Sequence, residues 1–404
     1  MKRLLSKKKV LCLILCVLFS LLLVCPVFAA AEGEGQALQA RKDGSFRILL
    51  IADTQDRDKP QQLTIDLLNA ELDAADADLV IFLGDMIYGP YVGADRDKVE
   101  AAIRTIIEPV VERNLPFAVV FGNHDDEDCL SKEEQLAIYQ SYPNCLNKDP
   151  DIPGVGNTCL PLYNGNDKSP AILLWLMDSG TYVEEGEPGK YAYVKEEQNQ
   201  WFRDGVASYG ADQPTSYVFQ HIPVPQVFTL VEEAKAFSKG AFCTFGNPFS
   251  DWYREVEGAV REGHFGETPC PPEVDSGQFQ SWKDCNVKAA FFGHDHTNDY
   301  VATIEGIDVV ATCGLGFYSY GRGDEHGARL LVLHTDRPGE YDTEMVYYKD
   351  LIDKPLNLFQ TPTLGAQLGK ILFLVIAGVI VLIVVIIILA SRAKKKKKSR
   401  RKEK

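Results

Sequence analysis

Near the start of the chain, residues 46–55 read FRILLIADTQ. The first seven of these residues are largely apolar, which is typical of a strand that is buried on both faces of a sheet. Three polar residues follow at once, namely Asp53, Thr54 and Gln55. The stretch therefore predicts a buried strand whose carboxyl end carries a carboxylate and an amide.

The same pattern returns further along the chain. Apolar runs that predict strands occur at 78–83, 116–121, 171–177, 216–220 and 287–292. The polar residues at their ends are Gly84-Asp85, Gly122-Asn123-His124-Asp125, Asp178-Ser179-Gly180, His221 and Gly293-His294-Asp295-His296. Helical spacing of apolar residues predicts helices at 61–75, 97–113 and 195–208.

We also expect shorter strands at 300–304, 307–312, 329–335 and 340–347. Alternation of strands and helices favours an α/β layered fold. Residues 129–170 and 224–285 break this alternation, and we expect them to be insertions that cover one rim of the fold.

The predicted strand ends share one kind of chemistry. In α/β sheets, ligands collect beyond the carboxyl ends of the strands. The ends here supply carboxylate, amide and imidazole groups, which suit hard or borderline divalent metals. A single Gly-Asp would be weak evidence, because turns favour those residues. Four of the seven histidines nevertheless fall at strand ends, which favours a metal site built from Asp53, Asp85, Asn123, His221, His294 and His296.

These strand-end motifs resemble the ordered motifs of the calcineurin-like metallophosphoesterases, over residues 46–348. Residues 293–299 (GHDHTND), 178–180 (DSG) and 198–202 (QNQWF) are similar to a small, single-domain branch related to the purple acid phosphatases. The resemblance implies a four-layer αββα sandwich with a dinuclear metal centre.

The resemblance also implies a role for each strand-end residue. Asp85 would bridge two metal ions. The first ion would also be bound by Asp53 and His296. The second ion would also be bound by Asn123, His221 and His294. His124 would face the substrate, as general acid or as a stabiliser of developing charge. Two cations about 3.5–4 Å apart lower the pKa of a shared water, and the hydroxide attacks phosphorus in line. The cofactors would be two divalent or mixed-valence ions of Fe, Zn or Mn.

The first motif departs from the family pattern. Asp-x-His is usual there, but Gln55 stands at the third position, and its carbonyl would bind a hard cation more weakly than imidazole does. Purple acid phosphatases have Gly at that position and a tyrosine three residues after the bridging Asp, where Tyr88 stands here. We hypothesise that Tyr88 ligates the first metal, as in an Fe(III) phenolate. The alternative is that Tyr88 fills a variable position of the Gly-Asp-x-x-x-Gly motif.

Three further residues are candidates for supporting roles. Asp125 would orient His124, or would be an ordinary acidic turn residue. Asn298 and Asp299 would orient His294 or His296.

The charge of the chain is uneven. It has 42 basic and 57 acidic residues, a formal charge of −15. Residues 1–9 carry five positive charges, and residues 391–404 carry ten positive and one negative. The stretch between them then has 27 basic and 56 acidic residues, a charge of −29. This argues against nucleic acid as a partner and fits poorly with a nuclease.

The two ends of the chain resemble segments that direct a protein to a membrane, and we do not expect them to belong to the folded domain. Residues 1–31 combine a basic start, an apolar stretch and Ala29-Ala30-Ala31, which predicts a Sec signal peptide; an uncleaved anchor or a lipoprotein Cys25 are alternatives. After a linker at 349–369, residues 370–390 predict a transmembrane helix, because 371–390 are twenty uncharged residues that span about 30 Å. The basic tail at 391–404 would then be cytoplasmic. A sortase-type signal is the alternative.

Cysteine usage gives a further expectation. Seven cysteines lie outside the predicted signal peptide, and in an oxidising compartment these could pair. We expect one disulfide within Cys129, Cys145 and Cys159, another within Cys243, Cys270 and Cys285, and a buried free thiol at Cys313.

The sequence thus predicts a membrane-anchored, extracytoplasmic phosphohydrolase. Its substrate would be a phosphate monoester or diester, either a small molecule or a molecule at the cell surface. The alternative is a non-catalytic surface binding protein on a degenerate phosphoesterase fold. Gln55 is the residue that motivates this alternative.

Overall fold

The computed structural model describes residues 37–357, except 212 and 245–248, together with residue 360 and helical residues between 372 and 388. The elements below belong to the unit Leu38–Lys404. The predicted signal peptide (1–31) and basic tail (391–404) lie outside the described residues, and the predicted span at 370–390 is described only in part. Among the described residues, no helix combines the length and the apolar character that crossing a membrane requires.

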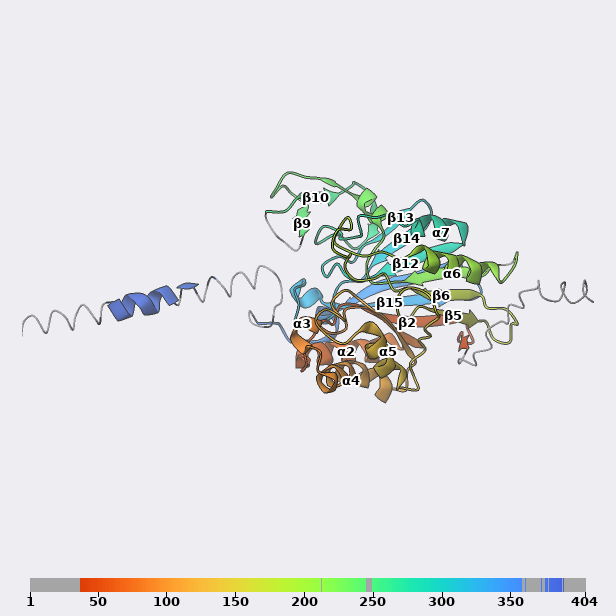
Figure 1. Ribbon diagram of the computed structural model, residues 1–404, viewed down its shortest axis with the longest axis horizontal. Helices are drawn as coiled ribbons and strands as arrows, with labels where there is room; N and C mark the ends of the chain where they lie inside the picture. Colours follow the sequence, from red (N-terminus) through yellow and green to blue (C-terminus); the bar gives the residue numbers. More distant parts are fainter. Residues whose placement is uncertain are drawn as a thin grey trace, which may run out of the picture. The chain divides into compact units, whose positions relative to one another are not determined.

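Two sheets lie at the centre of this unit (Figure 1). The five-stranded sheet has the order β16-β15-β2-β3-β4. Its strands are β2 (Ser45–Ile51), β3 (Leu79–Leu83), β4 (Phe117–Val120), β15 (Gly327–His334) and β16 (Tyr341–Tyr347). Strands β2, β3 and β4 run parallel, so their carboxyl ends reach the same edge of the sheet.

The eight-stranded sheet has the order β1-β5-β6-β7-β12-β14-β13-β11. Its strands are β1 (Leu38–Gln39), β5 (Thr158–Tyr163), β6 (Ile172–Leu176), β7 (Thr215–Phe219), β12 (Val287–Phe292), β14 (Ile307–Ala311), β13 (Val301–Ile304) and β11 (Val260–Glu262). Strands β6, β7, β12 and β14 run parallel in the middle of this sheet.

Helices cover the outer face of each sheet. One apolar core joins the five-stranded sheet to α2 (Gln62–Ala75), α4 (Arg96–Glu112) and α5 (Lys132–Gln140). A second core joins the eight-stranded sheet to α6 (Glu196–Ala207) and α7 (Gln278–Asp284). A third core, with Ile48, Leu174 and Phe291, lies between the sheets. The described residues therefore form the four layers that the sequence predicted, with helices outside two sheets (Figure 1).

Local sequence explains where several elements begin. The Asp95 side chain accepts hydrogen bonds from the backbone N–H groups of Asp97 (3.1 Å) and Lys98 (3.4 Å), and so caps α4. Ser131 and Glu134 form a capping box at the start of α5. Every residue of β3 and β6 is buried, as expected for strands with a packed layer on each face.

The remaining described elements lie mostly in the loops. They are α3 (Gly89–Val92), η1 (Pro225–Leu230), β8 (Val231–Glu233), β9 (Ala241–Cys243), β10 (Trp252–Glu255), η3 (Gly323–Glu325) and α8 (Tyr348–Leu351). Strands β8, β10 and β9 form a small antiparallel sheet within the second predicted insertion.

The first predicted insertion is partly wrong. Residues 129–170 contain α5 and also β5, which pairs with β6 inside the eight-stranded sheet. Pro161 hid this strand, because proline lacks a backbone donor and usually marks an edge strand or a loop. Strand β5 accommodates it because its other neighbour is the two-residue strand β1.

The expectation of two disulfides is also wrong. All seven cysteines between 129 and 313 are free thiols. Cys129 and Cys145 pack against the core under α2 and α4, whereas Cys159 and Cys285 belong to the core under α6 and α7. The prediction of Cys313 as a buried free thiol is confirmed.

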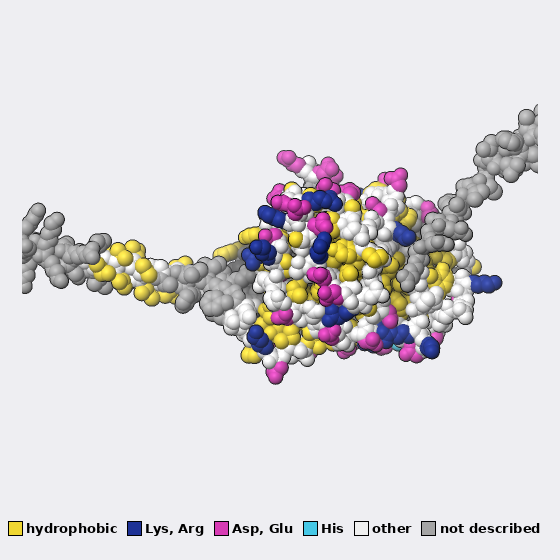
Figure 2. Space-filling view, turned by 90° about the horizontal axis from the view of Figure 1, so that it is seen from below, with side chains coloured by type: hydrophobic (Ala, Val, Ile, Leu, Met, Phe, Trp, Pro, Cys, Tyr) yellow, Lys and Arg dark blue, Asp and Glu magenta, His cyan; other side chains and the backbone are white. Residues whose placement is uncertain are grey.

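The outer faces of the helices carry charges of both signs. Ion pairs join Arg113 to Asp73 at 2.7 Å and Arg104 to Glu100 at 3.1 Å. Figure 2 shows acidic and basic side chains interspersed on one face of the molecule. Exposed pairs of this kind contribute only about 0–1 kcal/mol each, so apolar packing against the sheet holds these helices in place.

Candidate metal centre

The predicted donor residues follow the carboxyl ends of β2, β3 and β4 in one sheet and of β7 and β12 in the other. Backbone hydrogen bonds tie these ends together. The N–H of Asp53 donates to the carbonyl of Gly84 at 3.1 Å, and the N–H of Gly293 donates to the carbonyl of His221 at 3.2 Å. The N–H of His294 donates to Asp53 Oδ2 at 3.0 Å, which links the two sheets directly.

Three of these side chains form a compact group that could hold a metal ion. Asp53, Asp85 and His221 each offer one ligand atom within 4.8 Å of the others. His296 Nε2 lies 3.3 Å from Asp53 Oδ1, and His221 Nε2 lies 3.3 Å from Asp85 Oδ2. His294 Nδ1 lies 3.3 Å from His221 Nε2, so the structure brings five of the predicted donors together.

Backbone carbonyls fix the ring orientation of two histidines. Leu83 O lies 2.7 Å from His221 Nδ1, and Tyr320 O lies 3.1 Å from His296 Nδ1. Because a carbonyl only accepts, each Nδ1–H donates to it. The Nε2 atom of each ring then faces the carboxylates, which is the usual arrangement of metal-binding histidines.

Several buried polar atoms at this site lack a hydrogen-bond partner among the described residues. Buried polar atoms are nearly always hydrogen-bonded, so a cluster of exceptions indicates a missing group. The atoms are carboxylate and amide oxygens and one imidazole nitrogen, a donor set that suits a borderline divalent cation. They are Asp53 Oδ1, Gln55 Oε1, Asn123 Oδ1 and His294 Nε2.

The protonation of two of the three histidines also fits cation binding. Burial lowers the pKa of His296 to about 4 and that of His294 well below its usual range, so both are neutral at pH 7. Burial also acts to lower the pKa of His221, but the Asp85 carboxylate outweighs it and raises this pKa to about 9. A bound cation would compete with that proton.

The backbone is strained at the same positions. Four predicted donors adopt positive φ angles, a region that non-glycine residues occupy only in a few per cent of cases. They are Asp53 (51°), Gln55 (36°), Asp85 (50°) and His294 (72°). A Cβ at Gly84 would lie 2.6 Å from His221 Nδ1, and one at Gly122 would lie 2.1 Å from Asp85 Oδ1. The glycines of these motifs therefore allow the donor side chains to approach.

Gln55 and Tyr88 both line the same cavity of about 180 Å³. Gln55 Nε2 donates to Asp85 Oδ2 at 3.4 Å, which leaves the amide oxygen as the atom without a hydrogen-bond partner. The Tyr88 ring packs against that of His124, with ring centroids 5.1 Å apart. Burial and the nearby Glu127 raise the pKa of Tyr88, so its phenol is neutral at pH 7. The Gln55 amide oxygen is thus a buried acceptor without a partner at the cavity, and the contacts of Tyr88 are those of a wall residue.

His124 is positioned by a residue that sequence reasoning missed. Its Nδ1 lies 2.5 Å from Glu127 Oε2, and its backbone N–H donates to Asp85 Oδ1 at 2.8 Å. The ring lines the cavity together with Asp85 and His296. The available signal was the acidic run after His124, in which the sequence analysis selected Asp125 instead.

The prediction that Asp125 orients His124 is wrong. Its carboxylate accepts four backbone hydrogen bonds instead, because it is buried beneath the loops that follow β3 and β4. The donors are the N–H groups of Gly122 (2.7 Å), Met86 (2.8 Å), Asp85 (3.0 Å) and Ile87 (3.2 Å). Asp125 therefore holds the loop that carries Asp85.

Asn298 and Asp299 do not contact His294 or His296 in the way that the sequence analysis predicted. Asn298 Oδ1 accepts from the N–H groups of Gly266 and Glu267, at 2.9 and 3.0 Å. Asp299 pairs with Arg322 at 3.0 Å. Both residues anchor neighbouring loops, and neither lines the cavity.

Two tyrosines support donor residues and were not found from the sequence. Asn123 Nδ2 donates to the Tyr182 hydroxyl at 2.9 Å, which leaves Asn123 Oδ1 free to face a cation. Tyr320 stacks on His296 with ring centroids 4.3 Å apart, and its hydroxyl donates to Glu267 at 2.8 Å. No periodicity or motif marks these tyrosines, since both lie in loops.

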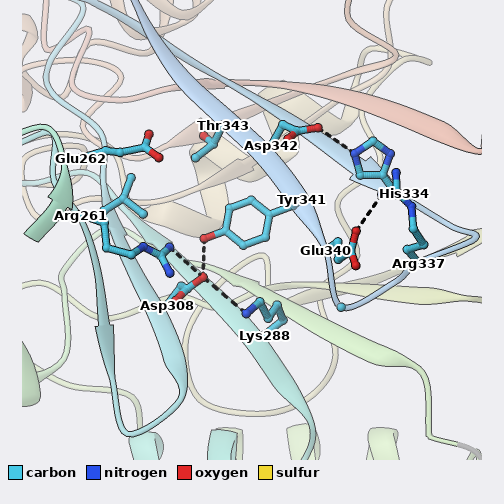
Figure 3. Close-up of a pocket in the computed structure, with 12 residues that line it drawn as sticks. Arg261, Glu262, Lys288, Asp308, His334, Arg337, Glu340, Tyr341, Asp342 and Thr343 are labelled. Carbon is cyan, nitrogen blue, oxygen red and sulfur yellow. Dashed lines mark hydrogen bonds and ion pairs between the residues drawn. The ribbon is translucent and has the colours of Figure 1, made fainter.

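A second cavity, of about 450 Å³, is built differently (Figure 3). Its charged side chains already pair with one another. Asp308 Oδ2 lies 3.1 Å from Arg261 and 3.6 Å from Lys288, and His334 pairs with Asp342 at 2.8 Å. Figure 3 shows these pairs across the cavity. The donor cluster at the strand ends is therefore the candidate site.

Known proteins resemble this chain over much of its length. A relative described as probable inactive purple acid phosphatase 28, from Arabidopsis thaliana, is 30% identical over 73% of this chain and 76% of its own length. Phosphatase DCR2 of Saccharomyces cerevisiae is 28% identical over 66% of this chain and 46% of its own length. A dimetal phosphatase structure from Danio rerio aligns with a TM-score of 0.46 at 16% identity, covering 75% of this chain and 99% of that one.

The sequence profile of the calcineurin-like phosphoesterases matches residues 46–298, which is more than half of the chain. These residues contain the strand ends and every donor of the candidate centre. The chain belongs to the calcineurin-like phosphoesterase family.

Proposed function

We propose that this protein is a metal-dependent phosphoester hydrolase that acts on phosphate monoesters, with diesters as further substrates. The observation that carries the proposal is a cluster of buried donor atoms without hydrogen-bond partners at the strand ends of both sheets, beside a cavity that Gln55, Asp85, His294 and His296 line. The chain's membership in the calcineurin-like phosphoesterase family supports the same class of reaction.

The donors divide into two sets around Asp85. Bound there, two divalent or mixed-valence ions of Fe, Zn or Mn would lower the pKa of a shared water and offset the charge of the phosphate. One set consists of Asp53, Gln55 and His296, and the other of Asn123, His221 and His294. Asp85 would be the residue that the two sets share, since its Oδ2 lies 3.3 Å from His221 Nε2 of one set and 3.4 Å from Gln55 Nε2 of the other.

His124 is placed to handle the leaving group. With Glu127 Oε2 at 2.5 Å from its Nδ1, its Nε2 is the ring atom left to face the cavity. A proton at Nε2 can pass to the oxygen of the departing alcohol, or stabilise the charge that develops on it. Lys190 also lines the cavity, where its charge can attract the phosphate.

A second candidate function is a non-catalytic binding protein on the same fold. Gln55 stands where the family usually has histidine, and its amide donates to Asp85. A similar protein from Arabidopsis carries the description "probable inactive". Such a protein would bind metal and phosphate without turning over an ester.

Metal analysis combined with hydrolysis of 4-nitrophenyl phosphate separates the two functions. For the hydrolase, we expect metal in the purified protein and a turnover that His124→Ala lowers by about 10²–10⁴-fold, with metal content unchanged. Equal inactivity of wild type and His124→Ala, both metal-loaded, would favour the binding protein.

We also propose that a C-terminal helix anchors the protein in the cell membrane with its catalytic domain outside the cytoplasm. Support comes from the uncharged run at 371–390, the basic tail at 391–404 and the signal-like residues 1–31. Extraction of membranes with alkaline carbonate should leave the protein in the pellet. Protease added to intact cells should cleave the domain, and protection of the domain would contradict this orientation.

A further inference from the structure

The cavity at the metal centre is small for a complete substrate. Its volume is about 180 Å³, whereas cavities that enclose a whole organic ligand measure roughly 300–1,000 Å³. A phosphate group fits there, but most of a bulky leaving group must lie elsewhere.

A larger cavity adjoins it. This leaving-group cavity has a volume of about 670 Å³ and shares Lys190 and Tyr191 with the metal cavity. Tyr182 stacks on Tyr191 with centroids 5.8 Å apart and lies 6.4 Å from the His124 ring. Tyr182 therefore contacts both His124 and Tyr191, and these two residues line the same metal cavity. A phosphate ester is long enough to reach from His124 to the wall that the two cavities share.

Hydrogen bonds fix the wall that the two cavities share, which consists of Lys190 and Tyr191. The backbone N–H of Lys190 donates to Glu273 Oε2 at 3.0 Å, and its ammonium donates to the Tyr191 hydroxyl at 2.8 Å. A Cβ at Gly189 would lie 2.1 Å from the same Glu273 oxygen, so this loop packs tightly on the 270–273 segment. The junction between the cavities is therefore a built feature of the fold.

The leaving-group cavity presents mainly apolar surfaces. Phe228 and Tyr253 pack edge to face, with centroids 5.7 Å apart, and Phe228 is 40% exposed. The rings of four prolines also line the cavity, and each proline fixes the local backbone φ angle. They are Pro225, Pro269, Pro271 and Pro272.

We propose that this cavity binds the leaving group, and that the natural substrate is a phosphate monoester of an apolar alcohol or phenol. This inference rests on the proposed hydrolase function. In the bound substrate, the phosphate lies at the metal donors, the ester oxygen lies near His124, and the apolar chain passes Tyr191 to reach Phe228 and Tyr253. On hydrolysis the P–O bond to the alcohol breaks, water supplies the new P–O bond, and the alcohol oxygen takes up a proton.

Binding of two phosphonates tests the inference without requiring turnover. Phenylphosphonate and 4-butylphenylphosphonate are titrated against the metal-loaded full chain in lipid nanodiscs, with empty nanodiscs as the blank for partition. We expect the butyl compound to bind at least about tenfold more tightly, because it buries four additional carbons. Equal dissociation constants would overturn the inference.

Variants then locate the binding. Phe228→Ala combined with Tyr253→Ala should reduce the preference to within about twofold while phenylphosphonate still binds. Phe237→Ala is the matched control, because Phe237 is 77% exposed and lies in the same insertion without lining this cavity. If the double variant does not fold, Phe228→Asp provides the same test at a partly exposed position. An unchanged preference in the folded variants would overturn the assignment.

Hydrolysis of phenyl phosphate and 4-butylphenyl phosphate tests the hydrolase function separately, since the two phenols have similar acidity. Preferential phosphonate binding without hydrolysis of either ester would support the leaving-group cavity and contradict the hydrolase. Hydrolysis of both esters at equal kcat/KM, with equal phosphonate binding, would support the hydrolase and overturn the inference.

Discussion

At the level of single residues, the candidate site depends on side chains that hold other side chains. His124 faces the cavity because Glu127 holds its Nδ1, and Asn123 directs its oxygen inward because Tyr182 accepts from its nitrogen. These contacts are 2.5 and 2.9 Å long. Glu127 contacts His124 Nδ1 and Tyr182 contacts Asn123 Nδ2, neither of which is a predicted metal-ligating atom, so each acts as a positioning residue.

Glu127→Gln weakens the contact that orients His124. We expect kcat for 4-nitrophenyl phosphate to fall about 10–100-fold, with KM and metal content within twofold of wild type, because only the group at the leaving oxygen is misplaced. Glu133→Gln, an exposed change at the start of α5, is the control. Steady-state kinetics would contradict the role if KM alone rose or if both variants behaved as wild type.

Tyr182→Phe removes the hydroxyl that accepts from Asn123. The amide can then rotate, and we expect one of the two metals to bind about 10–100-fold more weakly. Competition with a chelator, followed by metal analysis, measures this affinity. Tyr193→Phe, in the same loop, should bind both metals as the wild type does, and an equal loss in both variants would argue against the specific contact.

At the level of elements, the loops that follow β3 and β4 form one unit around Asp125. Four backbone N–H groups converge on its carboxylate, at 2.7–3.2 Å. The sequence predicted both strands and the donors at their ends, because apolar runs followed by Gly-Asp and Gly-Asn-His are local signals. It did not predict the role of Asp125, because a carboxylate that accepts from backbone groups of another loop leaves no trace in residue spacing.

Asp125→Asn should loosen this loop unit. An amide offers one acceptor oxygen in place of two, and its NH₂ group faces backbone donors, so we expect a loss of about 1–3 kcal/mol in the free energy of unfolding. Chemical denaturation measures the change. Asp128→Asn, three residues away and exposed, should leave the unfolding midpoint unchanged, and equal midpoints for both variants would contradict the role given to Asp125.

Helix α2 carries a buried carboxyl that should make stability depend on pH. Glu71 Oε1 accepts from the N–H of Ala328 at 3.1 Å, and burial raises the pKa of Glu71 to about 9. The unfolded chain releases this proton near pH 4.5, whereas the folded chain keeps it. Its contribution to stability is therefore complete below pH 4.5 and is lost as the pH rises from there towards 9.

Glu71→Gln removes that titration. Between pH 5.5 and 8.5, this group should lower the free energy of unfolding of the wild type by about 1.4 kcal/mol per pH unit, so we expect Tm of the wild type to fall more steeply with pH than Tm of the variant. Glu108→Gln on the exposed side of α4 should follow the wild type. Parallel Tm profiles for all three proteins would show that Glu71 titrates normally.

At the level of the whole molecule, the site exists because two sheets present their strand ends at one place. The order of the motifs along the chain, through the family resemblance, was enough to predict the layers, and the structure brings Asp53, Asp85, His221, His294 and His296 together. The second sheet's extra strand β5, the free thiols of the other six cysteines and the leaving-group cavity were not predicted, because they depend on how 129–170 and 224–285 pack. These segments lack a periodic pattern, and tertiary contacts alone determine their positions.

The central claim is that the predicted metal-binding residues at the strand ends bind two metal ions, and that the resulting centre hydrolyses a phosphate ester. A titration of the metal-free full chain with a divalent metal, read as the initial rate of 4-nitrophenyl phosphate hydrolysis, tests it most directly. The account predicts that the rate rises until two metal ions are bound per chain and then remains constant, and that Asp85→Asn stays near the uncatalysed rate. A wild-type rate that stays at the uncatalysed level with two ions bound, or an active Asp85→Asn variant, would contradict it.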